Sequence, residues 1–332
     1  MASSRTPPNP KSALVVGAGI VGLMTARELS GRGWSVLVLT RDDPLATTSA
    51  MAGAIWYPFL AEPRDRVLAW SAISYRRLAA LACSVSGRDG AAGVRMREVV
   101  EVFAEASPDL WWREAVPTVQ WLPAEDLPSG AASAVRVTVP VFDVPRHLSW
   151  LLSELARLGV DVVRGEVTSL DDALLDGFLA VVNCTGLGAR ELCGDDELRA
   201  VRGQVLRYSG IELPNAWIDD RRTRPCYLIP RDHDLVAGGS ADLGDERLAE
   251  DANDSLEIRR AATDAFPQLA GRDPIAVQVG LRPYRSSVRL EAERGAGGQL
   301  LAHCYGHGGS GYTVAWACAE EVVDRLEQAV GG

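Results

Sequence analysis

The hexapeptide GAGIVG at residues 17–22 constrains the fold of this chain more than any other segment. It follows an apolar run at residues 12–16 that is typical of a buried parallel strand, and it opens a helical pattern that reaches Ser30. A second apolar run follows at residues 34–39. In such a frame the glycines allow a tight turn, a close approach of the backbone to a pyrophosphate, and close packing of the helix on the strand. The sequence therefore predicts a dinucleotide-binding α/β fold.

The second predicted strand ends differently from most dinucleotide-binding strands. An acidic side chain usually binds the ribose hydroxyls there, but this strand ends in Thr40 and Arg41, and Asp42 and Asp43 come slightly later. Arg41 is suited to contact a phosphate instead, so the residue that binds the ribose stays open.

Two later glycine segments favour FAD over NAD as the dinucleotide. A strand at residues 179–182 is followed by a glycine turn at Gly186 after a long insertion, and FAD needs several separate chain segments around it. Glycines are then concentrated at residues 306–311, before a helix that we expect to begin near Thr313. The N-terminus of that helix carries partial positive charge, which would stabilise an anionic reduced flavin.

Length and charge limit the remaining possibilities. A chain of 332 residues usually forms more than one domain. The net charge of −10 disfavours nucleic acids and anionic membranes as partners, and no apolar run reaches the roughly 18 residues of a membrane span. Residues 1–11 are polar and rich in proline, so we expect a disordered lead-in without a secretion signal, and a cytoplasmic protein. Since the cysteines and histidines show no metal-ligand spacing, no metal is expected.

Six motifs together resemble the D-amino-acid oxidase family and occur in the order of that family. They cover residues 12–326 and are GAGIVG at 17–22, TTSAMAGAIWYP at 47–58, VNCTG at 182–186, CYLIPR at 226–231, GLRPYRSSVRLE at 280–291 and YGHGGSG at 305–311. The resemblance implies a Rossmann-like FAD-binding domain interleaved with an α+β substrate-binding domain. The expected boundaries are 12–57, 141–197 and 278–330 for the FAD-binding domain, and 58–140 and 198–277 for the substrate-binding domain.

The resemblance also implies an activity. It is the FAD-dependent oxidation of D-amino acids to imino acids, which hydrolyse to 2-oxo acids and ammonia, while O2 is reduced to H2O2. The D stereochemistry rests on the resemblance alone. A related flavin amine oxidase that acts on glycine, D-aspartate or a specialised amino acid is the alternative; an NAD(P)-dependent dehydrogenase and a flavoprotein without turnover are two further ones. The oligomeric state stays open, with a homodimer among the options.

The residues of the site follow from the motifs by position. In the family resemblance Arg282 binds the substrate carboxylate, Tyr227 is the active-site tyrosine, and the carbonyl of Gly309 accepts a hydrogen bond from the substrate amine. A guanidinium suits the first role because it stays charged and pairs with a carboxylate through two hydrogen bonds. The expected cofactor-binding residues are Gly17, Gly19, Ile20, Gly22, Arg41, Thr48, Ser49, Gly53, Val167, Gly186, Gly308, Gly311, Tyr312 and Thr313.

The surroundings of Arg282 carry further expectations. Arg282 should stand at the end of a strand at residues 275–281, where a ligand crevice can form. His307 is expected to make a structural hydrogen bond, and no histidine is expected as a required base. Arg224 and Arg231 are candidates to bind an acidic side chain, with a surface role as the alternative for both.

Three positions depart from the family pattern. Thr223 stands where animal members carry a lid tyrosine, which leaves the lid and the preferred substrate size open. Gly188 and Ser310 replace bulkier residues, and both substitutions are expected to widen the pocket.

Overall fold

The computed structural model describes residues 11–170, 177–294 and 299–331. Apart from Lys11, the predicted disordered lead-in lies outside these residues. The described part forms a mixed α/β structure, which confirms the predicted fold class, and its helices are α1 (Ile20–Gly31), α2 (Arg64–Cys83), α3 (Val85–Arg88), α4 (Val144–Arg157), α5 (Ala189–Cys193), α6 (Ala252–Ala265) and α7 (Gly311–Gly331). None of these helices is long and apolar enough to cross a membrane.

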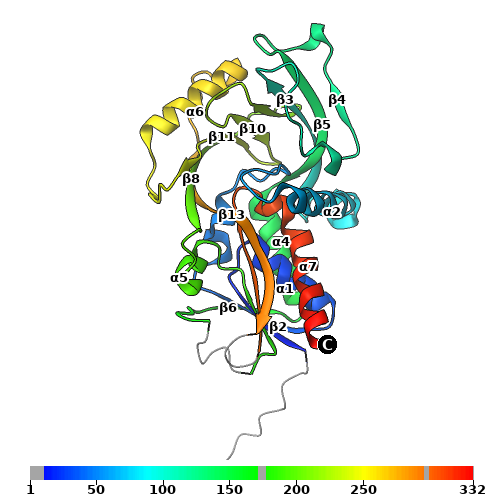
Figure 1. The fold of residues 1–332 in the computed structure, drawn as a ribbon. Coiled ribbons are helices and arrows are strands. Elements are labelled where there is room, and N and C mark those ends of the chain that lie inside the picture. Colours follow the sequence, from blue (N-terminus) through cyan, green and yellow to red (C-terminus); the bar gives the residue numbers. More distant parts are fainter. Residues whose placement is uncertain (1–10, 171–176, 295–298, 332) are drawn as a thin grey trace, which may run out of the picture.

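One hydrogen-bonded sheet runs along the molecule (Figure 1). Within the described residues it contains 14 strands. They are β1 (Ser12–Val16), β2 (Ser35–Thr40), β3 (Val94–Phe103), β4 (Val119–Trp121), β5 (Ser133–Phe142), β6 (Asp161–Arg164), β7 (Ala180–Asn183), β8 (Arg199–Tyr208), β9 (Ala216–Asp219), β10 (Tyr227–Pro230), β11 (Leu235–Gly238), β12 (Asp242–Leu243), β13 (Ala276–Arg294) and β14 (Leu300–His307). Because strands of both predicted domains join this sheet, the division into two domains stays a prediction.

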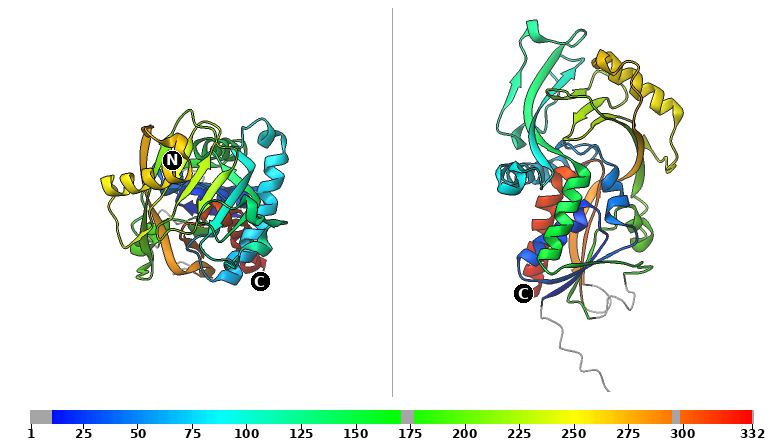
Figure 2. Two further views of the ribbon diagram at one scale, coloured as in Figure 1. Left: turned by 90° about the horizontal axis from the view of Figure 1, so that it is seen from above. Right: turned by 180° about the vertical axis from the view of Figure 1, so that it is seen from behind.

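The lower part of the molecule in Figure 1 is the parallel part of the sheet. Strand β1 pairs in parallel with β2 and β7, β2 pairs with β6, and β7 pairs with β14. Helices α1, α4 and α7 pack together beside these strands (Figure 2). Their apolar faces are fully buried at Leu23, Leu148, Leu151 and Val322, because each helix repeats apolar residues at helical spacing. The strand expected at residues 12–16 and its parallel pairing are thus confirmed.

The upper part is mostly antiparallel. Strand β3 pairs antiparallel with β5 and parallel with β9, and the order continues through β10, β11 and β8 to β13. Helix α6 covers β8 and β11 (Figure 1). The two parts of the sheet therefore meet at β13.

Strand β13 corrects the expectation for Arg282. The strand does not end at residue 281 but continues to Arg294, so Arg282 lies in its interior. The reason is a change of partner: β13 pairs with β8 as far as Tyr284 and with β14 from Arg289 onward, and the register shifts between these two residues. A strand that passes between two partners stays extended beyond the point where its first partner ends.

Candidate active site

A cavity of about 990 Å³ opens between the two parts of the sheet. Its walls include the turn after β1, the end of β2, the segment at residues 46–55, the turn after β7 and the turn between β14 and α7. Residues of β8, β13 and the loop between β9 and β10 complete the lining. The cavity is therefore shared by the predicted dinucleotide site and the upper sheet.

Close backbone packing shapes the turn between β1 and α1. Gly17 has φ +106°, and a Cβ atom there would lie 2.5 Å from the carbonyl oxygen of Cys184. A Cβ atom on Gly22 would lie 1.9 Å from the carbonyl oxygen of Gly17. Both contacts are far shorter than a side chain allows, so only glycine fits this turn.

The segment around Ser49 lies over the start of α1. The backbone N–H of Ile20 donates to Ser49 Oγ at 2.9 Å, and a Cβ atom on Gly19 would lie 3.1 Å from the same oxygen. Tyr312, in the first turn of α7, donates its hydroxyl to the carbonyl oxygen of Ser49 at 3.0 Å. Two helix starts and one loop therefore converge at this end of the cavity.

All predicted site residues line this cavity except Gly22 and Thr313. Gly22 packs against the turn, as the motif requires. The Thr313 hydroxyl accepts from the N–H of Tyr57 and donates to its carbonyl oxygen, both at 3.0 Å. Ser310 binds the backbone of Phe59 in the same way, at 2.7 and 3.0 Å. These two hydroxyls fix residues 57–59 to the start of α7, so Ser310 does not widen the pocket, whereas Gly188 does line it.

Arg282 and Tyr227 lie beside one another on the cavity wall. Arg282 Nη1 donates to the carbonyl oxygen of Ser240 at 3.0 Å, and the guanidinium lies 5.8 Å from the ring centre of Phe59. Burial raises the pKa of the Tyr227 hydroxyl, while the positive charge of Arg282 acts in the opposite direction. Tyr227 therefore stays a neutral hydrogen-bond donor at neutral pH.

Two glycines that the sequence analysis did not single out make room for this pair. A Cβ atom on Gly203 would lie 2.2 Å from Arg282 Nη1, and one on Gly238 would lie 2.1 Å from Tyr227 Cζ. Gly203 stands inside β8, and Gly238 is the last residue of β11. A glycine within a strand often marks the close approach of another group, and this signal could have identified them.

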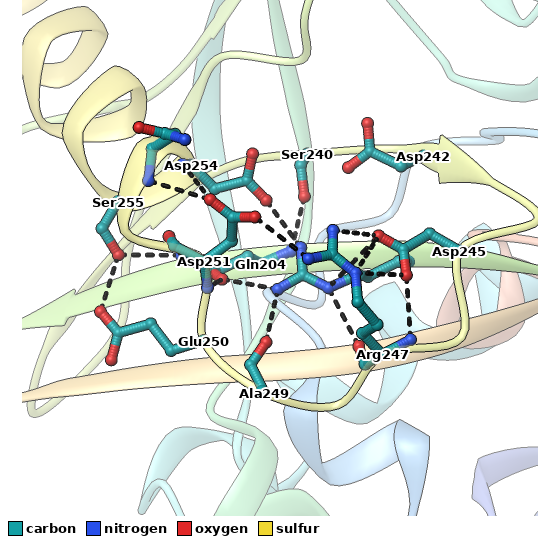
Figure 3. A network of polar contacts seen from close by, with 12 residues as sticks. Gln204, Ser240, Asp242, Asp245, Arg247, Ala249, Glu250, Asp251, Asp254 and Ser255 are labelled. Carbon is teal, nitrogen blue, oxygen red and sulfur yellow. Dashed lines mark hydrogen bonds and ion pairs between the residues drawn. The ribbon is translucent and has the colours of Figure 1, made fainter.

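A network of polar contacts joins Gln204 on β8 to the segment at residues 245–255 (Figure 3). Arg202, next to Gly203 on β8, is fully buried and donates to Asp254 at 2.6 Å, to Gln204 at 2.8 Å and to the carbonyl oxygen of Ala249 at 2.8 Å. The network ties residues 245–255 to the strand that underlies Arg282. A buried guanidinium needs such complete pairing because desolvation of an unpaired charge is costly.

The candidate cations for an acidic substrate are already paired. Arg231 is buried with Asp234, at 2.6 and 2.7 Å, and does not line the cavity. Arg224 lines the cavity, but it pairs with Asp254 at 2.8 Å among other carboxylates. Within the described residues, Arg282 is the cavity arginine without a carboxylate partner.

Two further buried titratable groups lie near the cavity. His307 lines it, and burial lowers the pKa of its imidazole to about 4, so the ring is neutral at neutral pH. The hydroxyl of Tyr57 donates to Glu101 Oε1 at 2.7 Å. Burial raises the pKa of the Glu101 carboxyl to about 8, so this group is largely protonated at neutral pH.

Comparison with known proteins identifies the fold and the family. A family described as FAD dependent oxidoreductase matches residues 12–325. The chain belongs to this family. A D-amino-acid oxidase from Rubrobacter xylanophilus is 40% identical over 93% of this chain and 94% of its own length. A D-amino-acid oxidase from Streptomyces coelicolor is 37% identical, with 93% and 94% covered. These relatives confirm the resemblance found in the motifs.

Among solved structures, glycine oxidase from Geobacillus kaustophilus has a similar fold. Its TM-score is 0.80 at 18% identity, and 95% of this chain and 94% of that chain are covered. As in the family, FAD is the cofactor of this chain. The site fits FAD because the Gly17–Gly19 backbone is open to a pyrophosphate, and the start of α7 at Gly311 faces the same cavity.

Proposed function

We propose that the protein oxidises D-amino acids to imino acids, which hydrolyse to 2-oxo acids and ammonia, while O2 is reduced to H2O2. The observation that carries this proposal is the position of Arg282 and Tyr227 in the cavity that also contains the dinucleotide turn. FAD supplies the two-electron chemistry when it is bound. The names of the relatives support the D stereochemistry.

The residues of the chain would then bind and orient the substrate. Arg282 holds the carboxylate, and its bond to the carbonyl oxygen of Ser240 fixes the guanidinium in place. Tyr227 donates its hydroxyl to the same carboxylate, and the carbonyl of Gly309 accepts from the amine. Catalysis by this chain then consists mainly of orientation, with no charged histidine at the site.

The predicted cofactor residues complete the proposal. Gly17, Gly19 and Ile20 would contact the pyrophosphate, with Ser49 beside them. The start of α7 would face the flavin with its partial positive charge, which stabilises the reduced form.

Glycine oxidation is the second candidate function, because one of the solved structures with a similar fold is a glycine oxidase. We also propose a cytoplasmic location, and a homodimer remains a prediction.

An anaerobic spectral titration tests the proposal. Purified FAD-loaded protein is mixed with D-amino acids, their L-enantiomers and glycine, and the flavin absorbance is followed. We expect bleaching with D-amino acids and none with the L-enantiomers. Bleaching by glycine alone would favour the second candidate, and a spectrum that no amino acid changes would overturn the proposed substrate class.

A further inference from the structure

The loop between β9 and β10 forms the wall of the cavity next to Tyr227. Six of its residues line the cavity, and so does Asp219 at the end of β9; the six are Asp220, Arg222, Thr223, Arg224, Pro225 and Cys226. The N–H of Asp219 donates to the carbonyl oxygen of Cys226 at 2.8 Å and closes the loop. The substrate side chain would therefore meet this loop once Arg282 holds the carboxylate.

The arginines of this loop are paired with carboxylates. Arg221, Arg222 and Arg224 each make at least one ion pair between 2.6 and 3.3 Å. Their partners are Asp219 and the carbonyl oxygen of Ser129 for Arg221, Asp219 and Asp264 for Arg222, and Asp242, Asp254 and Glu257 for Arg224. An acidic substrate side chain would have to displace one of these carboxylates, which costs the pairing energy.

Asp220 differs from its neighbours because it has no partner. Within the described part of the chain, its carboxylate makes no hydrogen bond or ion pair, although it lines the cavity. Asp220 is exposed at the rim of the fold, yet partial desolvation and the nearby carboxylates of Glu105 and Asp219 raise its pKa, and the charge of Asp220 raises the pKa of Glu101 in turn. Asp220 therefore supplies an unpaired carboxylate at this end of the cavity.

The position of Asp220 suits the end of a long side chain. Ile218 pairs directly with Tyr227 in the antiparallel β9–β10 ladder. Asp220 comes two residues later, directly beyond the end of β9, so its Cα lies roughly 7 Å from that of Ile218. That step is comparable with the four-carbon stem of a lysine-type amine. A substrate carboxylate at Arg282 and Tyr227 thus leaves room for a cationic group near Asp220.

We propose that Asp220 selects D-amino acids with a cationic side chain, an amine or a guanidine, over neutral and acidic ones. This inference rests on the proposed function. The binding site itself is defined by Arg282, Tyr227 and the cavity that they share with the dinucleotide turn, and not by the acidic residues. Asp220 is a specificity-determining residue because it would touch the side chain and not the reacting atoms.

The test compares Asp220→Asn with the wild type as FAD-loaded enzymes. D-Lysine and D-arginine are assayed against D-methionine, a neutral substrate of similar length. In the variant, kcat/KM for the cationic substrates should fall roughly 10- to 100-fold, mainly through KM, as expected for loss of a charge-assisted hydrogen bond. The value for D-methionine should stay within about threefold, because the Arg282 contacts are unchanged.

Two controls make the outcome decisive. Glu105→Gln removes an exposed neighbouring carboxylate that does not line the cavity, and it should leave the ratio of D-lysine to D-methionine activity nearly unchanged. Asp220→Glu should keep the preference of the wild type. An unchanged ratio in Asp220→Asn, or an equal loss on all substrates, would overturn the role of Asp220. A wild type that no D-amino acid reduces would instead refute the proposed function.

Discussion

The two ends of the cavity are built by different means. The dinucleotide end consists of backbone: the glycines that form the turn after β1 lie within six residues of each other, and a Cβ atom on Gly17 or Gly22 would collide with neighbouring backbone. The substrate end depends on side chains that come from distant segments, and its wall is backed by pairs such as Arg202 on β8 with Asp254 on α6. A site made of backbone is determined by residues that are neighbours in the sequence. A charge network depends instead on which distant segments the fold brings together.

The largest effect is expected from Gly22→Ala. The new methyl group would lie 1.9 Å from the carbonyl oxygen of Gly17, so α1 and the turn would have to move apart. We expect the variant to lose most of its bound flavin, measured as visible absorbance per protein after purification. Gly31→Ala is the matched control, because it lies on the same helix with no atom within 4 Å of the added Cβ. Full flavin content in Gly22→Ala would show that the backbone turn is less restrictive than its geometry indicates.

This contrast explains how much could be predicted. Strand β1 appears with the predicted bounds, because an apolar run that ends at a glycine turn is a local signal. Strand β8 and helix α6 were not predicted. The sequence of β8, RAVRGQVLRY, places Arg202 and Gln204 in the interior, where alternation would call for apolar residues. Their partners lie some 50 positions away, so no window of sequence reveals that they are buried.

The site was predicted unevenly for the same reason. The motifs locate Arg282 and Tyr227, and the structure brings both to the cavity. They do not reveal the strand partners that keep Arg282 in the interior of β13. Nor do they show that Arg224 is neutralised by carboxylates while Asp220 is not. Charge at the substrate end is set by pairing, and pairing is a tertiary property.

Arg282→Ala should give the second largest effect and separate the two ends functionally. Loss of the guanidinium removes one partner of a desolvated ion pair with the substrate, at about 3–5 kcal/mol. We expect kcat/KM for D-amino acids to fall by at least roughly 100-fold, while flavin content and Tm stay near those of the wild type. Arg259→Ala, which removes a half-exposed arginine paired with Asp273, serves as the control. Activity near the wild-type level in Arg282→Ala would remove the carboxylate-binding assignment.

Glu101→Gln should give the smallest effect of the three substitutions. It tests whether burying the Glu101 carboxyl without a cationic partner destabilises the fold at the substrate end. The pKa of Glu101 is raised from 4.5 to about 8, so the folded protein keeps this proton over a range in which the unfolded chain releases it. Stability of the wild type is therefore lost as the pH rises from about 4.5 through about 8, by on the order of 3–5 kcal/mol at most.

Glutamine cannot ionise, and its amide oxygen can still accept the hydrogen bond from Tyr57. The Tm of Glu101→Gln should thus match that of the wild type near about pH 5 and exceed it increasingly toward about pH 9. Glu105→Gln removes an exposed carboxylate just beyond β3 and should show a Tm difference that does not grow with pH. If the difference for Glu101→Gln were also independent of pH, the carboxyl would be ionised in the folded protein. The desolvation cost of a charged Glu101 beside Tyr57 would then have to be offset by other interactions of the carboxylate.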